Sequence, residues 1–540
     1  MYTPEAVNHA GNGALLNLDD GYMHVAGIGV VPKDMGWTTQ KAKGLAPRIG
    51  ITYQLDNKTV LRAGYGRSFD LGVFGSIFGH VVTQNLPILA AQSVQTGSPT
   101  AAAFNMSAGP PAAALPTVPS NGLLPAQGYS VSPKARPNPL QFPTIDAWNL
   151  SIQRALTSTT SLTVAYVANK GTHTLGDTNQ NNTNPNESGL FLPAQYSVTG
   201  QALNWDPAGL DGILPAGYSG GVKNSDYLKR YYGGSLAACR DTAYATPTSP
   251  NIKPGMCGWN QGISYYGDDQ NTEFDALQIT LAQQMSKGLA FTSNYQWASA
   301  YGDQNGYWTW DHHVTHLRDS NVRRQQLTVY GSYDFPFGKG KQFGSGMNKA
   351  ADLLIGGYQV SATASIASGL PWSPGYDDFN AGGTGNPQNC QWNVGGTAAP
   401  CRPNANGHMK TKLSSFDANK HQRTFFTAQP RQGGIFSFPG LNKIGNAGAN
   451  TYFGPSIWTS DVAVSKSFSV WESVAIKFRV DAFNAFNHIT TGQPNNDVLG
   501  GGSANAGDAA GNITGMGQGC DQPDSSCGPR HLQLALRVQF

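Results

Sequence analysis

The chain is poor in charge and lacks any long apolar run. Asp, Glu, Lys and Arg make up 12% of its 540 residues, about half the share in average soluble domains. No stretch of roughly 18 apolar residues is present, so we expect no membrane-spanning helix. The net charge of +3 is too small to indicate a nucleic-acid partner. No basic segment followed by an apolar one opens the chain, so we expect no secretory signal. For a membrane barrel this implies that Met1 is not the natural start, or that the upstream part was removed.

Aromatic residues and Gly are plentiful, and the last ten residues show how the apolar side chains are arranged. Residues 531–540 alternate between apolar side chains, at Leu532, Leu534, Leu536, Val538 and Phe540, and mostly polar ones between them. Because successive side chains of a strand point to opposite faces, this segment predicts a strand with one apolar and one polar face. Such a strand suits a membrane barrel, where the apolar face meets lipid and closure removes the exposed edge.

The same alternation recurs about eleven times, in segments long enough for a tilted strand to cross a bilayer. The expected strands centre on residues 49–53, 61–65, 148–152, 162–166, 277–282, 289–297, 327–333, 354–366, 458–468, 474–482 and 531–540.

The connections between these segments alternate between short and long. Tight turns are expected at residues 55–58, 157–160, 285–288 and 469–472, with one longer linker around 336–351. The alternate connections are long, at about 70–143, 169–271, 300–320, 369–455 and 488–529. Short turns on one side and long loops on the other are typical of an outer-membrane barrel. The sequence therefore predicts an all-β, transmembrane antiparallel β-barrel with short periplasmic turns and long extracellular loops.

The six cysteines form three local pairs, each confined to one long loop. The spacing predicts disulfides Cys239–Cys257, Cys390–Cys401 and Cys520–Cys527, formed in an oxidising compartment. The alternative, a metal site, requires a C-x-x-C type of spacing that is missing here.

Several segments resemble the barrel of TonB-dependent outer-membrane receptors, specifically the Oar-like type that bears a carboxypeptidase regulatory-like domain and is abundant in Acidobacteria. The most specific is Phe478-Arg-Val-Asp-Ala-Phe-Asn-Ala-Phe-Asn-His488. The others are residues 46–53, 58–66, 147–154, 271–281, 295–297, 331–339, 356–360, 368–371 and 458–468.

The resemblance implies energised uptake, in which loops capture a nutrient and a plug opens when TonB pulls. A full-length member would also carry a signal peptide, a TonB box, a plug and about twice as many strands. We therefore expect an N-terminally truncated form, the C-terminal part of the barrel. Residues 1–45 are expected to be an extracellular loop remnant and residues 46–540 the receptor-like barrel. The resemblance further implies that TonB is a partner only of a full-length form.

Candidate catalytic and metal-binding motifs are few. Gly217-Tyr-Ser-Gly-Gly221 matches the G-x-S-x-G nucleophile pattern, but no strand precedes it and no helix follows. His312, His313 and His316 could bind a transition metal, although an exposed polar loop is the preferred interpretation. We expect neither an enzyme nor a cofactor.

Two groups of residues are candidates for contact with a solute. Lumen-facing side chains are expected at Arg48, Arg62, Lys477, Arg479, Asp481 and Arg537. They could guide an anionic solute, but the preferred interpretation is that they hydrogen-bond across the wall or hold a plug. Ligand-binding aromatic residues are expected at Trp259, Tyr307, Trp308, Trp310 and Trp372. The equal alternative is that these residues fill the interior of the loops.

The sequence thus predicts an outer-membrane receptor or transporter that takes up a scarce nutrient, such as a ferric chelate or an oligosaccharide. The alternative is a passive porin or a surface adhesion scaffold, which needs no plug. Expected partners are outer-membrane lipid and lipopolysaccharide, an unknown small solute, and the barrel-assembly machinery through Phe540.

Overall fold

The protein is described from a computed structural model of the whole chain. The structure describes residues 10–11, 13–35, 44–70, 80–89, 94, 96, 98–112, 116–125, 133–174, 262–268, 270–303, 316–375, 402–415, 423–426, 435–437, 445–469, 475–495, 512–513 and 529–539.

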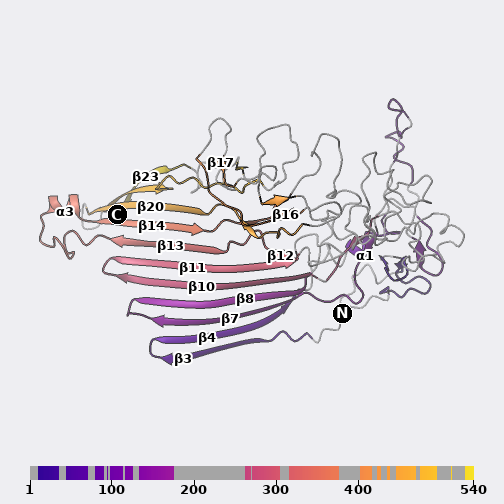
Figure 1. Ribbon diagram of the computed structural model, residues 1–540, viewed down its shortest axis with the longest axis horizontal. Helices are drawn as coiled ribbons and strands as arrows, with labels where there is room; N and C mark the ends of the chain where they lie inside the picture. Colours follow the sequence, from indigo (N-terminus) through magenta and orange to yellow (C-terminus); the bar gives the residue numbers. More distant parts are fainter. Residues whose placement is uncertain are drawn as a thin grey trace.

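One large antiparallel sheet dominates the molecule, and Figure 1 shows its strands side by side. Its members are β3 (Arg48–Asp56), β4 (Thr59–Phe69), β7 (Thr144–Ala155), β8 (Thr160–Thr174), β10 (Gln270–Ser286), β11 (Leu289–Asp303), β12 (His316–Arg318), β13 (Gln325–Asp334), β14 (Tyr358–Ala367), β20 (Ile457–Ser469), β21 (Ala475–Phe483) and β23 (His531–Gln539). Eleven of them follow one another in chain order from β3 to β23, and β12 pairs only with β11. The eleven expected strands are confirmed.

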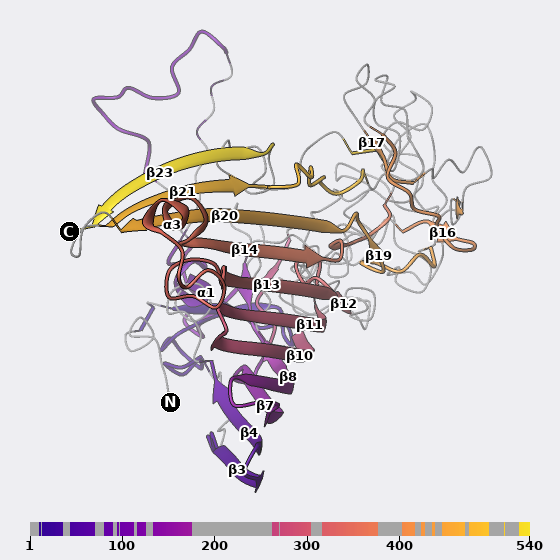
Figure 2. The same cartoon turned by 90° about the vertical axis from the view of Figure 1, so that its left-hand side faces the viewer.

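The sheet is curved but its two edges do not meet. Figure 2 shows β3 and β23 at opposite ends of a bent surface, and among the described strands no pairing joins them. The strands twist and coil because each L-residue chain has a right-handed twist, which turns a sheet this wide into a curved wall.

The register of the strands places most apolar side chains on one face of the sheet and most polar side chains on the other, from one edge to the other. Phe478 lies opposite Leu536, and one residue further Lys477 lies opposite Arg537. A slip of one residue would move every side chain to the other face. We call the side that carries Leu536 the apolar face and the side that carries Arg537 the polar face.

The apolar face is exposed along most of its width. Leu532, Leu534 and Leu536 are each exposed by 67% or more, and Ile51 at the other edge by 62%. Further exposed members of this face are Ile49, Tyr53, Leu150, Ile152, Val164, Tyr166, Trp297, Ile366, Val464, Phe478 and Val538. Soluble monomers rarely expose so large a contiguous apolar surface.

Short turns join the strands at one end of the sheet, as expected. Asp56 accepts a hydrogen bond from the Lys58 backbone N–H (2.7 Å), which closes the turn between β3 and β4. In the turn between β10 and β11, Lys287 and Gly288 both have positive φ (50° and 84°), as two-residue hairpins require. The C-terminal end of β23 lies at this same end of the sheet (Figure 1).

The linker between β13 and β14 differs from expectation. Leu354 was expected to begin a strand, but it lies in helix α3 (Lys349–Ile355). Asn348 caps the helix by accepting the Ala351 N–H (2.8 Å), and the Gly356 N–H bonds back to the Asp352 carbonyl. A local cap followed by Ala-Ala-Asp-Leu-Leu favours a helix, and the pair Gly356 and Gly357 separates it from β14. The expected strand is thus shortened to β14.

Small sheets occupy the other end, where the long connections lie. Their strands are β1 (Ala14–Leu16), β2 (Tyr22–Val25) and β5 (Leu123–Pro125); β6 (Lys134–Ala135) and β9 (Ser264–Tyr265); β15 (Pro371–Trp372) and β19 (Tyr452–Phe453); β16 (Asn404–Ala405) and β18 (Phe436–Ser437); and β17 (Arg423–Thr424) and β22 (Asn512–Ile513). The short helix α1 (His80–Thr83) lies beside them (Figure 1). In the described part of the chain no helix is long and apolar enough to cross a membrane.

Residues 13–35 pack into these small sheets and do not join the large one. Leu16, Met23 and Val25 are completely buried together with Leu86 and Leu124 from later loops. The side chain of Asn85 is buried as well and bonds to the Ala14 carbonyl (2.8 Å), so it fastens two distant segments. The long connections therefore have a hydrophobic core of their own.

Candidate functional site

The six residues expected to face the lumen all lie on the polar face. Arg48 lies on it through its register with Gly66, and Arg62 through its register with Ser151. The four C-terminal members lie on it in β21 and β23, at Lys477, Arg479, Asp481 and Arg537. The structure therefore places them on one surface but at its two opposite edges. Arg62 bonds across the wall to Gln153 (2.8 Å) and not to any of the other five.

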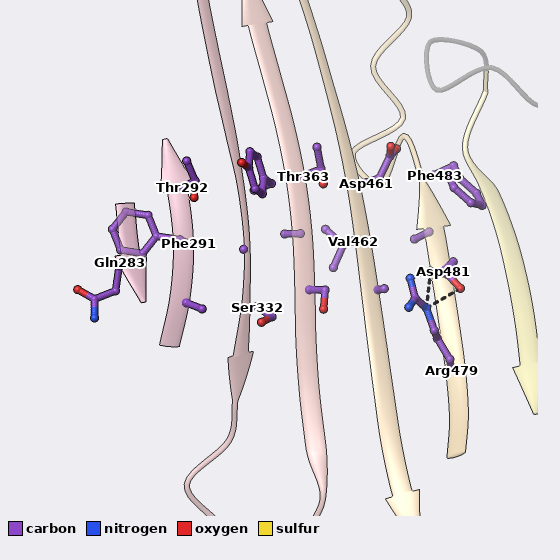
Figure 3. A pocket seen from close by; sticks show the side chains of 17 residues that line it. Gln283, Phe291, Thr292, Ser332, Thr363, Asp461, Val462, Arg479, Asp481 and Phe483 are labelled. Carbon is purple, nitrogen blue, oxygen red and sulfur yellow. Dashed lines mark hydrogen bonds and ion pairs between the residues drawn. The ribbon is translucent and has the colours of Figure 1, made fainter. Parts of the chain in front are cut away.

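A hollow of about 600 Å³ lies on this face, over strands β10 to β21. Figure 3 shows it, with Thr292, Thr363, Asp461 and Arg479 around it. Its wall also includes Gln283, Phe291, Tyr330, Ser332, Ser361, Val462, Asp481 and Phe483. Of the six expected residues, Arg479 and Asp481 belong to its wall, and the other four do not.

Two neighbouring rows of side chains explain why the face is hollowed here. One row crosses the sheet through small side chains, Ala290, Ser332, Ser361 and Ala463, and ends at Asp481. The row beside it carries larger ones, Thr292, Tyr330, Thr363 and Asp461. Because side chains in a strand stand roughly perpendicular to the sheet, a row of small residues beside a row of large ones leaves a depression.

The charges of the hollow are fixed by short contacts. Arg479 makes a two-pronged ion pair with Asp481, with Nη2 to Oδ1 at 2.7 Å and Nε to Oδ2 at 3.0 Å. Bidentate pairing of this kind holds a guanidinium in a defined orientation. Asp461 accepts the backbone N–H of Asn484 through Oδ1 (2.9 Å). Together Arg479, Asp481 and Asp461 carry one net negative charge, because there are two carboxylates and one guanidinium.

Asp461 and Tyr330 were not among the residues singled out from the sequence. Both belong to the polar series of their strands, so alternation places them on the correct face. Their importance arises from neighbours on adjacent strands, Tyr330 beside Thr292 and Thr363, and Asp461 beside Thr363. A single sequence does not state which residues of separate strands lie opposite one another.

Of the five aromatic residues expected to bind a ligand, the structure describes only Trp372. This residue is 6% exposed, and its ring stacks on that of Phe426, with ring centroids 5.1 Å apart. Phe425, Phe436 and Ala447 complete the surrounding cluster. Trp372 therefore fills the interior of a loop, which was one of the two expected interpretations, and ligand binding by it stays a prediction.

The other expected loop features lie outside the described residues. These are Trp259, Tyr307, Trp308, Trp310, His312, His313, the Gly217–Gly221 motif and all six cysteines. His316 is described and contacts Asp303 (3.2 Å). No group of three or more His, Cys, Asp or Glu side chains suited to a metal ion occurs in the described ranges.

Comparison with known proteins agrees with this architecture. Residues 1–533 match the outer membrane beta barrel domain family. The chain belongs to this family. Its place is accordingly the bacterial outer membrane, and its fold is an antiparallel membrane β-barrel wall. No curated protein matches the sequence of this outer-membrane barrel chain.

Similar solved structures are outer-membrane receptors and transporters. They include the outer membrane transporter YddB from Escherichia coli, 8% identical with a TM-score of 0.36, where the match covers 92% of this chain and 40% of that one. Another is BauA, the ferric preacinetobactin receptor from Acinetobacter baumannii, 9% identical with a TM-score of 0.33, covering 92% and 36%. A third is PiuA, a siderophore receptor from Acinetobacter baumannii, 8% identical with a TM-score of 0.33, covering 91% and 36%. The chain spans well under half the length of these proteins.

Proposed function

We propose that this chain forms part of the wall of an outer-membrane receptor that takes up a scarce nutrient, with the polar face lining the path of the solute. The observation that carries the proposal is the unbroken polar face, which runs across all eleven consecutive strands and contains the hollow beside Asp461 and Arg479. In an outer-membrane barrel the apolar face meets lipid and the interior is polar. Arg48, Arg62, Lys477 and Arg537 would then line the lumen further along the wall.

The side chains around the hollow favour a neutral or cationic polar solute. Hydroxyl groups of Thr292, Tyr330 and Thr363 offer both donors and acceptors, as sugars and chelates require. The two carboxylates exceed the one guanidinium, which disfavours an anion at this position. A neutral or cationic ferric chelate or an oligosaccharide fits this description, as does a similar polar nutrient.

We further propose that uptake is coupled to TonB in a full-length form and that the chain is of the Oar-like type. The support is the resemblance of the strand segments, above all residues 478–488, to that type of receptor. In this scheme the long connections, at about 70–143, 169–271, 369–455 and 488–529, lie outside the cell and capture the solute. Residues 46–540 form the barrel part, and residues 1–45 belong to an extracellular loop. The wall supplies binding sites and a path, and no bond is made or broken.

Filling the hollow tests the proposal. Ser361→Trp places a large ring in the row of small side chains, whereas Ser365→Trp adds the same ring to the same strand and face, four residues away and outside the hollow. Uptake of a panel of labelled ferric chelates and oligosaccharides is measured in cells that carry each variant in the full-length form of the receptor, with and without TonB. We expect uptake of one solute to depend on TonB and to fall at least tenfold in Ser361→Trp but less than twofold in Ser365→Trp.

Two results would overturn the proposal. Equal loss in the two variants would mean that the hollow has no special role in the path. Uptake that persists without TonB, together with a steady open conductance of the purified protein in planar bilayers, would support a passive porin instead.

A further inference from the structure

The linker between β13 and β14, residues 335–357, is a folded element at the short-turn end of the sheet (Figure 1). The Phe343 N–H bonds to the Pro336 carbonyl (2.9 Å) and the Gly338 N–H to the Phe343 carbonyl (3.0 Å). The rings of Phe337 and Phe343 lie 5.6 Å apart. These contacts close a small loop, and α3 follows it directly. The other turns described at this end are only two to four residues long, so this linker stands out by its size.

Lys466 fastens the end of α3 to the apolar face. Its Nζ donates to the carbonyl oxygens of Gly356 (2.7 Å) and Leu354 (3.1 Å). The same ammonium lies 3.9 Å from the ring centre of Tyr358 and 5.1 Å from that of Phe468. Lys466 is 8% exposed, and it shares the apolar face with Val464. The linker therefore joins the outward side of the wall and not the polar, inward side.

The linker exposes apolar side chains that nothing in the described chain covers. Leu354 is 73% exposed, Ile355 and Phe343 each 51%, Phe337 41% and Leu353 39%. Exposing five large apolar side chains to water costs free energy in proportion to their exposed apolar area. A short folded segment of this kind is expected to bury them against another phase or partner.

The charges of the linker are basic and complete an amphipathic element. Lys339, Lys341 and Lys349 are all exposed. Asp352 is the only acidic residue between 335 and 357. Its carboxylate accepts a hydrogen bond from the Lys339 backbone N–H (2.6 Å), which joins the small loop to α3. Apolar side chains combined with lysines are the composition of segments that lie in the headgroup region of a membrane.

We propose that residues 335–357 form an interfacial anchor, which rests in the periplasmic leaflet of the outer membrane. Leu353, Leu354 and Ile355 enter the upper acyl region, and the three lysines bind anionic phospholipid headgroups. Two observations select a lipid leaflet as the occupant. The linker is continuous with the apolar face through Lys466 and Tyr358, and its net positive charge complements anionic lipid. The anchor fixes the depth and tilt of β13, β14 and β20 at the periplasmic rim.

Site-specific photo-crosslinking tests the anchor directly. Benzoylphenylalanine replaces Leu354 in the protein in isolated outer membranes, and a second variant carries it at Ile355. The matched control carries it at Met106, which is 88% exposed in the long connection between β4 and β7. After irradiation, mass spectrometry of the labelled peptide identifies the adduct. We expect phospholipid adducts at Leu354 and Ile355 at a yield at least tenfold higher than at Met106.

Adducts with a second copy of the chain or with another protein, or yields equal to the control, would overturn the lipid assignment. Folded protein is recognised in each variant by its resistance to unfolding in cold detergent, so a failure to fold is not mistaken for a failure to bind.

The headgroup preference is tested in vesicles of phosphatidylethanolamine with or without phosphatidylglycerol. The variant that combines Lys339→Gln, Lys341→Gln and Lys349→Gln is compared with the unaltered linker, both with the probe at Leu354. We expect phosphatidylglycerol to raise the adduct yield at least threefold, and the triple variant to lose that increase. An equal yield in the two lipids would overturn the role of the lysines.

Discussion

Lys477 and Arg537 lie directly opposite each other across β21 and β23 on the polar face. Two cations in this position repel, because the side chains of opposed residues are only about 5 Å apart at their Cβ atoms. The next pair along the same face brings Arg479 opposite Ala535, and Arg479 is neutralised by Asp481 in its own strand. The unneutralised positive charge on the polar face of β21 and β23 is therefore concentrated at Lys477 and Arg537.

The opposed cations give the first prediction. Lys477→Glu replaces repulsion with a cross-strand ion pair, and we expect it to raise the free energy of unfolding by about 0.5–1 kcal/mol. Lys477→Gln, which only removes the repulsion, should give a smaller gain. Urea unfolding of the protein in detergent micelles measures both. A loss of stability in Lys477→Glu would show that Lys477 has a favourable partner elsewhere.

The two faces of β7 give the second prediction. Leu150 is 48% exposed on the apolar face, and the adjacent residue Asn149 is exposed on the polar face. We expect Leu150→Arg to lower the free energy of unfolding in lipid bilayers by about 2–4 kcal/mol, the cost of an arginine facing the lipid near the midplane. Asn149→Arg should change it by less than about 0.5 kcal/mol. Equal effects in the two variants would contradict the assignment of the faces.

The fastening of α3 gives the third prediction. Lys466→Met removes two charged hydrogen bonds to the carbonyls of Leu354 and Gly356, and we expect the local stability of the linker to fall by about 2–3 kcal/mol. Amide hydrogen exchange of residues 349–357 should accelerate, while exchange in β7 and β8 stays unchanged. Lys466→Arg keeps the charge and is the control. Unaltered exchange in Lys466→Met would mean that other contacts hold the helix.

His488 gives the fourth prediction, which concerns pH. Its ring lies 4.5 Å from that of Trp458, between centroids. Burial, and then the positive charge of Arg423, hold the pKa of His488 below its usual 6.5. Because the folded state takes up the proton less readily than the unfolded state, the stability contributed by the neutral ring is fully present above pH 6.5 and is lost as the pH falls below it.

We therefore expect amide exchange of residues 484–490 to accelerate when the pH is lowered from 7.5 to 5.5, after correction for the intrinsic rate. His488→Gln should abolish most of this pH dependence. If the dependence persists in that variant, another titrating group is responsible.

The strands and their turns were predictable because each depends on local sequence. Alternation within 531–540 or 148–152 follows from the period of two, and the turn at 285–288 contains the Lys-Gly pair that tolerates positive φ. The segment that began at Leu354 was misassigned because Leu354 continues the apolar series of β14 in sequence. Asn348, which caps the helix, and Asp352, an acidic residue in its first turn, were the signals that could have identified it.

The candidate site was predictable only in part. Alternation puts Arg479 and Asp481 on one face of β21, where they pair within the strand, but the hollow beside them depends on the register of β20 against β21. The role of Trp372 was not predictable from the sequence either, because an aromatic residue in a long loop is equally suited to bind a ligand or to fill the loop core. Its stacking on Phe426, which is 54 residues away, decides where it lies.

The sequence by itself determined the class of the protein, since low charge, period-two alternation and unequal connections each follow from having lipid on one side of a strand and water on the other. Tertiary structure decided which side chains meet. The opposition of Lys477 to Arg537, the row of small residues that hollows the wall, and the attachment of α3 by Lys466 all join strands or segments that a single sequence does not pair. Their positions depend on register and on contacts between distant segments, and those are fixed only when the whole sheet has assembled.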